Sequence, residues 1–346
     1  MKIAILCPTF LTYSGIDRVV EQQALKFSHE GNNVSILTLK ANIKPSLNIN
    51  LHVLGMPNNL LLQRIYRLFF FMDFIKVSRW VPKLKGFDCI YSHQYPMNWL
   101  AYIAKRRYGI RYIYYNHGYP PLKTFPNFIE RIYMKMITLS ANWTIRRADK
   151  AISVSQYLER ELRKETGVDS SIIYNEIDTE RFHLGIDGKQ VRQKYHLDND
   201  PLIVFVGRIT PQKGIHLLVN AFNIVKQKIP QAKLIIVGKH IFRDYSDHLK
   251  QISDNSVIFA EDVSDKEIPA YYAACDVYAT ATLWEGFDLP IAEAQACGKP
   301  VVAFDIGPHP EVINIGDEGK LVPVGDTAAM AEAIRSFLKV KSGVKP

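Results

Sequence analysis

The feature that most constrains the fold of this chain is an alternation of short apolar runs with longer helical patterns. The runs are rich in β-branched and aromatic residues, which favour strands. The first group is KIAIL, NVSILTL, FDCIYSH, RYIYYNH, KAISVS and SIIYN, and the second is PLIVFVG, AKLIIVG, SVIFA, DVYATA, KPVVAF and GKLVPV. Strands that alternate with helices in this way predict parallel sheets covered by helices, which is an α/β architecture.

The two groups of runs predict two domains. A polar stretch between Asn175 and Asp200 separates them, and a chain of 346 residues exceeds the size at which one hydrophobic core stops growing. We expect two doubly wound, Rossmann-like domains that face a cleft, one formed by residues 1–178 and the other by residues 179–346. Ligands of such sheets bind beyond the carboxyl ends of the strands, so the loops there are the places to search for function.

Charge is distributed unequally between the two halves of the chain. Residues 1–150 contain 21 Lys and Arg against 7 Asp and Glu, a net charge of +14, whereas the remainder has a net charge of −5. Such asymmetry suggests that the first half faces an anionic partner, either nucleic acid or lipid head groups. No nucleic-acid recognition motif accompanies the charge, so we expect no nucleic-acid partner and favour an anionic membrane surface.

One basic segment is a candidate for that membrane contact. The run NNLLLQRIYRLFFFMDFIKVSRWVPKLK interleaves leucine and aromatic residues with six basic ones: Arg64, Arg67, Lys76, Arg79, Lys83 and Lys85. It is either a core helix with snorkelling basic side chains or an interfacial helix. We favour the interfacial helix, which would let the protein reach a lipid-linked molecule.

The compartment is predicted from three features of the sequence. The four cysteines lie far apart in apolar segments with no C-x-x-C pair, which fits a reduced, cytoplasmic setting. The short apolar run in MKIAILCPTF favours a buried first strand over a signal peptide. No apolar run reaches the roughly 18 residues of a membrane-spanning helix. We therefore expect a cytoplasmic protein, peripheral on the cytoplasmic face of the membrane.

The stretch LWEGFDLPIAEAQAC carries two glutamates, Glu285 and Glu293. Pro290 fits the first turn of a helix, with Asp288 as a candidate cap, so that Glu285 lies in the loop and Glu293 on the helix. The backbone N–H groups of 286–289 and the positive end of the helix dipole form an anion site. A diphosphate there would place hydroxyl groups near both carboxylates. The alternative is a solvated loop charge and an ordinary helix residue.

A second candidate constellation follows the strand PLIVFVG. Arg208 and Lys213 lie beyond the end of this strand, where Gly207 and Gly214 permit close backbone approach. Two cations in this position could neutralise a diphosphate leaving group. Taken alone, they would fit a solvated, basic helix start equally well. The loop after the first strand has Gly15 but lacks the three glycines of a dinucleotide site, so the signal for such a site is weak. The D-x-D at 198–200 fits a turn, and we expect no metal site.

Together these segments resemble the donor domain of glycosyltransferase family 4, whose members are retaining enzymes of the GT-B fold. The resemblance rests on GRITPQKGIHLLVNAF, on DVSDKEIPAYYAACDVYATATLWEGFDLPIAEAQACGKPVVAFDIGPHPEVI and on GKLVPVGD, and its most specific part is the Glu-x(7)-Glu pattern inside E-G-F-x-L-P-x-x-E. It implies that residues 179–346 form the nucleotide-sugar donor domain and residues 1–178 the acceptor-side domain.

The resemblance also implies roles for individual residues. Arg208 and Lys213 match the pair that holds the donor diphosphate, and Glu285 matches the glutamate near the donor sugar. The other implied donor-binding positions are Gly207, the loop Gly286, Phe287, Asp288 and Leu289, the ribose-binding Glu293, Val263 beside the nucleobase, and Ser14 and Gly15 in the first loop. Asp288 stands where the family often has glycine, which would place a carboxylate beside the sugar.

Two histidines follow strands of the first half. His93 comes directly after FDCIYS, and His117 after RYIYYN. A histidine at a strand end is more often structural than functional, but the resemblance implies that His93 lies at the reaction centre and contacts the donor sugar. We expect His117 to order a loop or to lie on the acceptor side.

The resulting hypothesis is a retaining glycosyltransferase that moves a hexose-type sugar from a nucleoside-diphosphate sugar to a glycan or lipid-linked acceptor, without a metal or other cofactor. Two alternatives stay open. A sugar-nucleotide epimerase or hydrolase of the same fold would need no acceptor. A non-catalytic sugar-nucleotide sensor would need Arg208, Lys213 and Glu293 but not His93.

Overall fold

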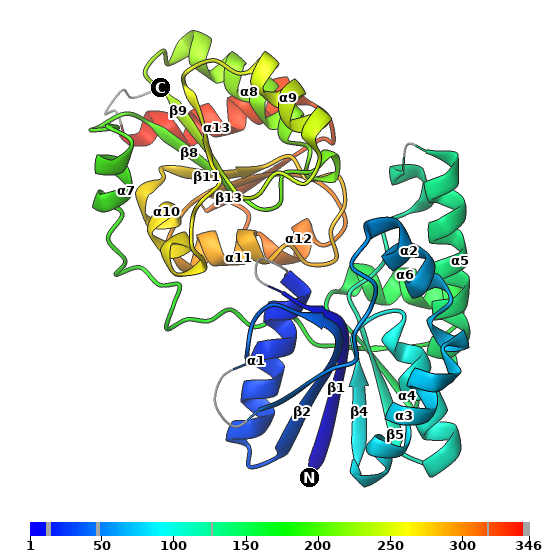
Figure 1. The fold of residues 1–346 in the computed structure, drawn as a ribbon. Coiled ribbons are helices and arrows are strands. Elements are labelled where there is room, and N and C mark those ends of the chain that lie inside the picture. The colour runs from blue at the N-terminus through cyan, green and yellow to red at the C-terminus, as the bar shows by residue number, and fades with distance from the viewer. Residues whose placement is uncertain (12–14, 46–48, 126, 317, 342–346) are drawn as a thin grey trace. The chain divides into compact units, whose positions relative to one another are not determined.

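A computed structural model describes residues 1–11, 15–45, 49–125, 127–316 and 318–341 of the chain. The chain divides into two compact units, Met1–Glu176 and Ile177–Pro346. Each unit is a parallel β-sheet with helices packed against it, as Figure 1 shows. This is the two-domain α/β fold class that the alternating pattern predicts.

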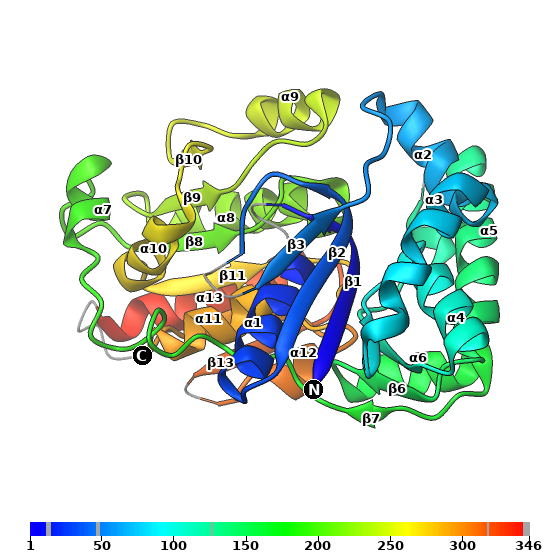
Figure 2. The same cartoon turned by 60° about the horizontal axis from the view of Figure 1, so that its bottom comes forward.

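The sheet of the first unit has the strand order β3-β2-β1-β4-β5-β6-β7, with every neighbouring pair parallel. In Figure 2, β1, β2 and β3 run side by side with α1 next to them. The strands are β1 (Lys2–Phe10), β2 (Asn33–Ala41), β3 (Asn50–Val53), β4 (Cys89–Ser92), β5 (Arg111–Asn116), β6 (Lys150–Ser153) and β7 (Ser171–Ile172). The main helices are α1 (Gly15–His29), α4 (Met97–Tyr108), α5 (Phe128–Ile145) and α6 (Gln156–Thr166).

The sheet of the second unit has the order β10-β9-β8-β11-β12-β13. Its strands are β8 (Leu202–Val206), β9 (Lys233–Val237), β10 (Val257–Ala260), β11 (Val277–Thr280), β12 (Val301–Phe304) and β13 (Gly319–Val322). Its helices are α7 (Lys189–Lys194), α8 (Ile215–Lys228), α9 (Arg243–Ile252), α10 (Ile268–Ala274), α11 (Leu289–Ala296), α12 (His309–Val312) and α13 (Thr327–Lys341), with short 3-10 turns η4 (Pro211–Lys213) and η5 (Asp265–Glu267). Buried side chains pack on both faces of this sheet.

Each sheet has one point where the strand order reverses. In the first unit it lies between β1 and β4, and in the second between β8 and β11. The loops that leave such neighbouring strands diverge to opposite faces, which opens a crevice at the carboxyl ends of the strands. The topology therefore predicts ligand-binding residues after β1 and β4 in the first unit and after β8 and β11 in the second.

Strand β3 is absent from the apolar runs of the sequence. Its residues Asn50–Val53 are mostly exposed, and it pairs with β2 at the edge of the sheet. An edge strand is held by backbone hydrogen bonds to one neighbour and needs no continuous apolar run, so its sequence carries little signal.

The basic segment 60–85 is neither a single helix nor uniformly exposed. It forms α2 (Leu60–Leu68), η1 (Phe70–Met72), α3 (Phe74–Trp80) and η2 (Pro82–Gly86). Phe70 and Leu84 are fully buried, whereas Phe74 and Ile75 are largely exposed. Part of the segment therefore belongs to the core and part of it is exposed, and contact with a membrane stays a prediction. Among the described residues, no helix is both long and apolar enough to cross a membrane.

Candidate functional site

The two loops of the second unit that follow β8 and β11 lie against each other. The strands are hydrogen-bonded neighbours, so residues beyond their ends converge. Leu283 N donates to the Gln212 carbonyl over 2.9 Å, and Gln212 Nε2 donates to the Trp284 carbonyl over 3.0 Å. Gln212 therefore joins the loop that carries Lys213 to the loop that carries Glu285.

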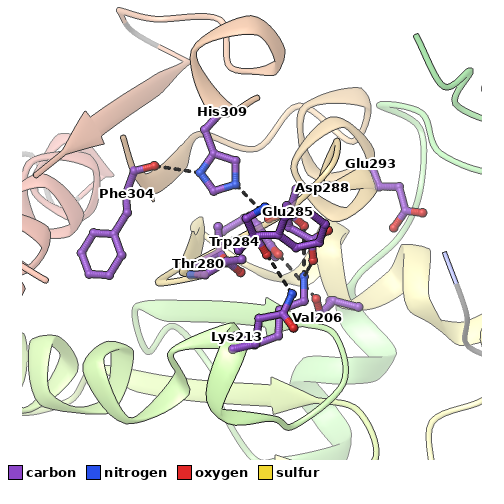
Figure 3. A network of polar contacts seen from close by, with 12 residues as sticks. Val206, Lys213, Thr280, Trp284, Glu285, Asp288, Glu293, Phe304 and His309 are labelled. Carbon is purple, nitrogen blue, oxygen red and sulfur yellow. Dashed lines mark hydrogen bonds and ion pairs between the residues drawn. The ribbon is translucent and has the colours of Figure 1, made fainter. Parts of the chain in front are cut away.

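Lys213 is the centre of a buried ionic network (Figure 3). Its side chain is only 10% exposed, and its Nζ lies 2.5 Å from Glu285 Oε1 and 3.4 Å from Asp288 Oδ1. Burial alone would lower the pKa of Lys213, but the carboxylates of Asp288 and Glu285 outweigh it and raise that pKa. The structure thus holds a permanent cation between two carboxylates at the carboxyl end of the sheet.

Asp288 takes part in this network through both carboxylate oxygens. Oδ1 faces Lys213, and Oδ2 lies 3.1 Å from Nε2 of His309. Burial by itself raises the pKa of Asp288, but Lys213 and His309 bring it down to about 2, so the carboxylate is ionised at neutral pH. Its backbone is left-handed, with φ of 68°, which is a conformation that favours glycine.

The predicted capping role of Asp288 is therefore wrong in one respect. Asp288 is the N-cap residue of α11 and Pro290 lies in the first turn, as the sequence predicts, but the Asp288 side chain makes no capping hydrogen bond. Its two carboxylate oxygens contact Lys213 and His309 instead of the backbone N–H groups at the start of the helix.

His309 is a member of the network that the sequence analysis did not single out. It follows β12, the neighbour of β11, and its ring is fully buried. Its Nδ1 lies 2.7 Å from the carbonyl oxygen of Phe304 and its Nε2 faces Asp288. The sequence does contain a signal for it, because His309 in FDIGPHPE follows a strand just as His93 and His117 do.

The two glutamates are separated as predicted, one in a loop and one on a helix. Glu285 lies in the loop after β11 and pairs with Lys213, whereas Glu293 lies on α11 and accepts a hydrogen bond of 2.8 Å from Tyr272 Oη. Figure 3 shows the Glu293 carboxylate apart from the Lys213 network. The two carboxylates therefore offer two distinct polar positions on either side of the start of α11.

The remaining predicted donor positions of the second unit follow the ends of β8, β10 and β11. Arg208 is exposed and lies near enough to lower the pKa of Lys213 by charge repulsion. Gly207 follows β8 and Val263 is buried in the turn after β10. The other loop members are Gly286 and the mostly buried Phe287 and Leu289.

Gly214 is a position at which only glycine fits. It has φ of 60°, and a Cβ there would lie 2.0 Å from the carbonyl oxygen of Ala281. The absence of a side chain lets η4 approach the end of β11, which is what brings Lys213 to the opposite loop.

In the first unit, His93 belongs to a buried neutral network. Its Nε2 lies 2.8 Å from Gln23 Oε1, so Nε2 carries a proton, and its Nδ1 lies 2.9 Å from Nε2 of His117. The His93 ring stacks on Tyr115. Burial lowers the pKa of His93 well below its usual range, with a further contribution from His117, and burial lowers the pKa of His117 to about 3.

In this network His117 contacts His93, and Gln23 is a further member. His117 donates to His93 Nδ1 and so fixes the tautomer in which His93 can donate through Nε2. Gln23 lies on α1 and holds that Nε2 proton. Gly15 is the first residue of α1, and Ser14 lies outside the described residues. Gln23 sits mid-helix, where nothing in the sequence distinguishes it from a surface glutamine.

In the part of the chain that the structure describes, no group of three or more His, Cys, Asp or Glu residues is arranged to hold a metal ion.

Comparison with known families places the chain. A family model for glycosyl transferases group 1 matches residues 200–339, and one for glycosyltransferase family 4 matches residues 13–181. Between them the two matches leave out only residues 1–12, 182–199 and 340–346. The chain belongs to glycosyltransferase family 4.

Individual relatives agree with the family. The chain is 29% identical over 206 residues to a GDP-mannose-dependent alpha-(1-6)-phosphatidylinositol monomannoside mannosyltransferase of Mycolicibacterium smegmatis, covering 55% of this chain and 53% of the relative. It is 30% identical over 217 residues to the lipopolysaccharide core biosynthesis mannosyltransferase LpsB of Rhizobium meliloti, covering 57% and 58%. The chain thus spans little more than half the length of these relatives.

A solved structure defines the fold. The crystal structure of HepE from Anabaena in complex with UDP and glucose superposes with a TM-score of 0.81 at 23% identity, covering 99% of this chain and 91% of that one. The fold is therefore that of the GT-B glycosyltransferases, as the sequence predicts.

Proposed function

We propose that the protein is a retaining glycosyltransferase that moves a hexose-type sugar from a nucleoside-diphosphate sugar to a glycan or lipid-linked acceptor. The observation that carries the proposal is the buried Lys213, held by Glu285 and Asp288 at the start of α11 with Arg208 nearby. A buried, paired cation beside a helix N-terminus is suited to a diphosphate, because both favour negative charge.

The proposed chemistry uses this arrangement to stabilise the leaving group. As the bond between the sugar and the diphosphate breaks, negative charge grows on the phosphate oxygens, where Arg208 and Lys213 stabilise it. The acceptor hydroxyl attacks the same face of the sugar, and a leaving phosphate oxygen takes its proton. Glu285 then orients the donor sugar and does not act as a hydrolase nucleophile.

His93 would contribute from the first unit as a neutral hydrogen-bond donor. Its Nε2–H, occupied by Gln23 in this structure, is directed by His117. A neutral imidazole can donate to a sugar hydroxyl without contributing a charge. No metal or other cofactor has a part in the proposed mechanism.

The donor and acceptor classes are suggested by relatives and by the site. One relative is described as GDP-mannose-dependent, and the neighbouring HepE structure holds UDP and glucose. Two relatives are described by acceptors or products that contain lipid, namely phosphatidylinositol monomannoside and lipopolysaccharide core. These descriptions support a hexose donor with either nucleobase and a lipid-linked or growing glycan acceptor.

The decisive experiment is a thermal-shift panel of UDP- and GDP-sugars, followed by product analysis. A ligand present at 100 times its dissociation constant should stabilise the protein by about 2.7 kcal/mol. The best donor is then incubated with and without candidate acceptors. Turnover that needs an acceptor and conserves the anomeric configuration supports the proposal.

Other results of that experiment identify the alternatives. Consumption of the donor without an acceptor indicates an epimerase or hydrolase, and binding without any turnover indicates a sensor. Inversion of the anomeric configuration would contradict retention. If no nucleoside diphosphate or sugar nucleotide shifts the melting temperature, the proposed function is wrong.

We further propose that the first unit docks on an anionic membrane on the cytoplasmic side. Helices α2 and α5 lie side by side in Figures 1 and 2, joined by Arg64 Nη2 and Glu130 Oε1 at 3.1 Å. Exposed apolar side chains lie along α2, α3 and α5: Leu60, Leu61, Leu62, Ile65, Phe74, Ile75, Phe128, Ile129, Ile132, Met136, Leu139 and Trp143. Such an apolar surface within a unit rich in Lys and Arg fits a lipid surface with anionic head groups.

Burial limits which aromatic side chains of the segment 60–85 are accessible for insertion into lipid. Phe69 is partly exposed, but Phe70 is buried in the core and Phe71 stacks on Trp99, so neither Phe70 nor Phe71 is available for insertion. Arg67 and Lys76 are also half-buried. The exposed residues of α3 and α5 are the better candidates for contact with lipid.

Cosedimentation with liposomes tests the docking. Lys135 is exposed on α5, and Lys123 is exposed shortly before this helix. Changing both to Gln should weaken binding to anionic liposomes by about 2 kcal/mol, or roughly thirtyfold, because each basic residue near the surface contributes about 1 kcal/mol. The matched control changes Lys228 and Lys250 of the second unit to Gln and should bind as the unchanged protein does. Equal binding to neutral and anionic liposomes, or none to either, would contradict the docking.

A further inference from the structure

The protonation of His309 follows from its two hydrogen-bond partners. A backbone carbonyl can only accept, so Nδ1 must donate to Phe304 O over 2.7 Å. The other nitrogen, Nε2, faces the ionised Asp288 carboxylate at 3.1 Å and must donate as well. A ring that donates from both nitrogens is an imidazolium, so His309 is a buried cation bound to a buried anion.

With His309 included, the charges of the four side chains linked through Lys213 and Asp288 balance. Lys213 and His309 are the cations, and Glu285 and Asp288 are the anions. Buried charges are tolerated when each is paired and hydrogen-bonded. If His309 were neutral or absent, Lys213 would be shared by two carboxylates, and the network of these three side chains would carry net negative charge beside the position proposed for the diphosphate.

The order of the contacts gives His309 an indirect role. It is anchored to β12 through Phe304, it holds one oxygen of Asp288, and Asp288 directs its other oxygen toward Lys213 (Figure 3). The left-handed backbone at Asp288 turns its side chain into this position instead of over the end of α11. The chain of contacts therefore runs from the sheet to the ammonium of Lys213.

We propose that His309 is a positioning residue which, through Asp288, fixes the ammonium of Lys213 for the diphosphate of the donor. The inference rests on the proposed function, because it assigns a diphosphate to Lys213. It also changes the interpretation of Asp288: its carboxylate serves the cation of the donor site and is not offered to the donor sugar.

Two amide substitutions separate the contacts of His309. A glutamine amide reaches the place of Nε2 and can still donate to Asp288, whereas an asparagine amide reaches only the place of Nδ1 and can donate to Phe304. His309→Gln therefore retains the link to Asp288, and His309→Asn loses it. A matched control is His216→Asn on α8, whose ring is hydrogen-bonded to Tyr245.

The readout is the affinity of each folded variant for UDP and GDP and for UMP and GMP, with thermal unfolding as a check of folding. His309→Asn should weaken diphosphate binding by about ten- to hundredfold, the range found when outer partners of ligating groups are removed at metal sites. Monophosphate affinity should change much less, because it depends less on Lys213. His309→Gln should retain more of the diphosphate affinity than His309→Asn, and the control should retain all of it.

A second set of variants keeps the proposal testable if His309→Asn is unstable. Asp288→Gly is compatible with the left-handed backbone and removes the intermediary. If His309 acts through Asp288, adding His309→Asn to Asp288→Gly should cause no further loss of diphosphate affinity, because the effects of groups in one chain of contacts are not additive.

Three results would overturn the proposal while leaving the proposed function intact. They are unchanged diphosphate affinity in His309→Asn when Lys213→Ala loses it, equal losses in the Asn and Gln variants, and additive losses in the double variant. If the unchanged protein binds neither UDP nor GDP nor their sugars, the proposed function fails first and this inference fails with it.

Discussion

Each unit holds a polar side chain beyond the carboxyl end of a strand, but the two units do so with different kinds of contact. In the first, His117 after β5 supports His93 after the neighbouring β4. In the second, His309 after β12 supports Asp288 after the neighbouring β11. The topology is equivalent, yet the first pair is neutral and the second is ionic.

The difference is caused by the partner of each histidine. His117 is buried against another imidazole, and desolvation lowers its pKa to about 3. His309 is buried against the ionised carboxylate of Asp288. Its two ring N–H groups donate hydrogen bonds, one to Phe304 O and the other to this carboxylate. Burial thus selects the neutral form when the partner is neutral and the ion pair when the partner is ionic. The first site suits hydroxyl groups, and the second suits phosphate charge.

The largest expected effect tests the ionic side of this comparison. Replacing Lys213 or Arg208 with Ala should lower turnover by about 10²–10³-fold, by analogy with the loss of oxyanion donors, about 2.7–4 kcal/mol. Only Lys213→Ala should also destabilise the fold, by about 3–5 kcal/mol, because it leaves buried carboxylates without their partner. Arg208 is exposed and serves as the control for stability. Steady-state kinetics and urea unfolding measure both; near-normal turnover in both variants would refute the assignment.

The next prediction separates the two glutamates of the second unit. Glu293→Ala should weaken nucleoside diphosphate binding by about 1.5–3 kcal/mol, the value of a hydrogen bond to a charged group. Glu285→Ala should mainly lower turnover while bare nucleoside diphosphate still binds, since Glu285 is assigned to the sugar. Calorimetric titration with UDP and GDP decides between them, and equal losses of affinity would contradict the two roles.

The third prediction uses pH to distinguish the units. His117 has a folded pKa of about 3 against an ordinary 6.5, so its contribution to stability is complete above pH 6.5 and is lost as the pH falls from 6.5 toward 3. Asp288, at about 2 against 3.8, contributes above pH 3.8 and loses its contribution only as the pH falls toward 2. Between pH 6 and 4 the first unit should therefore weaken before the second.

Hydrogen exchange of the amides in β4–β5 and β11–β12 resolves this difference. From pH 7 to pH 5, protonation of the unfolded state at His117 should lower the opening free energy of the first unit by about 2 kcal/mol. The His117→Gln variant keeps a donor toward His93 but has no titratable group at this position. Between pH 7 and pH 5, the opening free energy of its first unit should therefore fall by about 2 kcal/mol less than in the unchanged protein. An equal loss in the variant and the unchanged protein would show that His117 is not the group responsible.

The smallest expected effect is the response to metal removal. Because Arg208 and Lys213 already place cations at the proposed diphosphate position, a chelator should change turnover by less than about twofold, within the roughly 0.4 kcal/mol that such a factor represents. The assay compares EDTA-treated enzyme with and without added magnesium or manganese. Loss of activity in EDTA that either ion restores would show that the paired cations are insufficient.

Much of this molecule is determined by local patterns in the sequence. Alternating apolar runs specify the parallel strands, because each run must be buried between layers of helices. Pro290 marks the first turn of α11 and thereby separates a loop Glu285 from a helical Glu293. Strand ends also locate Arg208, Lys213 and His93, because polar residues directly after buried strands lie at the edge where ligands bind.

Tertiary structure alone decided which of those residues meet. Asp288 lies 75 residues from Lys213 and 21 from His309, and the three come together because β8, β11 and β12 are neighbours in the sheet. The same holds for Gln23, which lies 70 residues from His93. A local pattern specifies whether a side chain is buried, but its charge depends on the group it is buried against. That partner is set by strand order and by the left-handed turn at Asp288, which long-range packing selects.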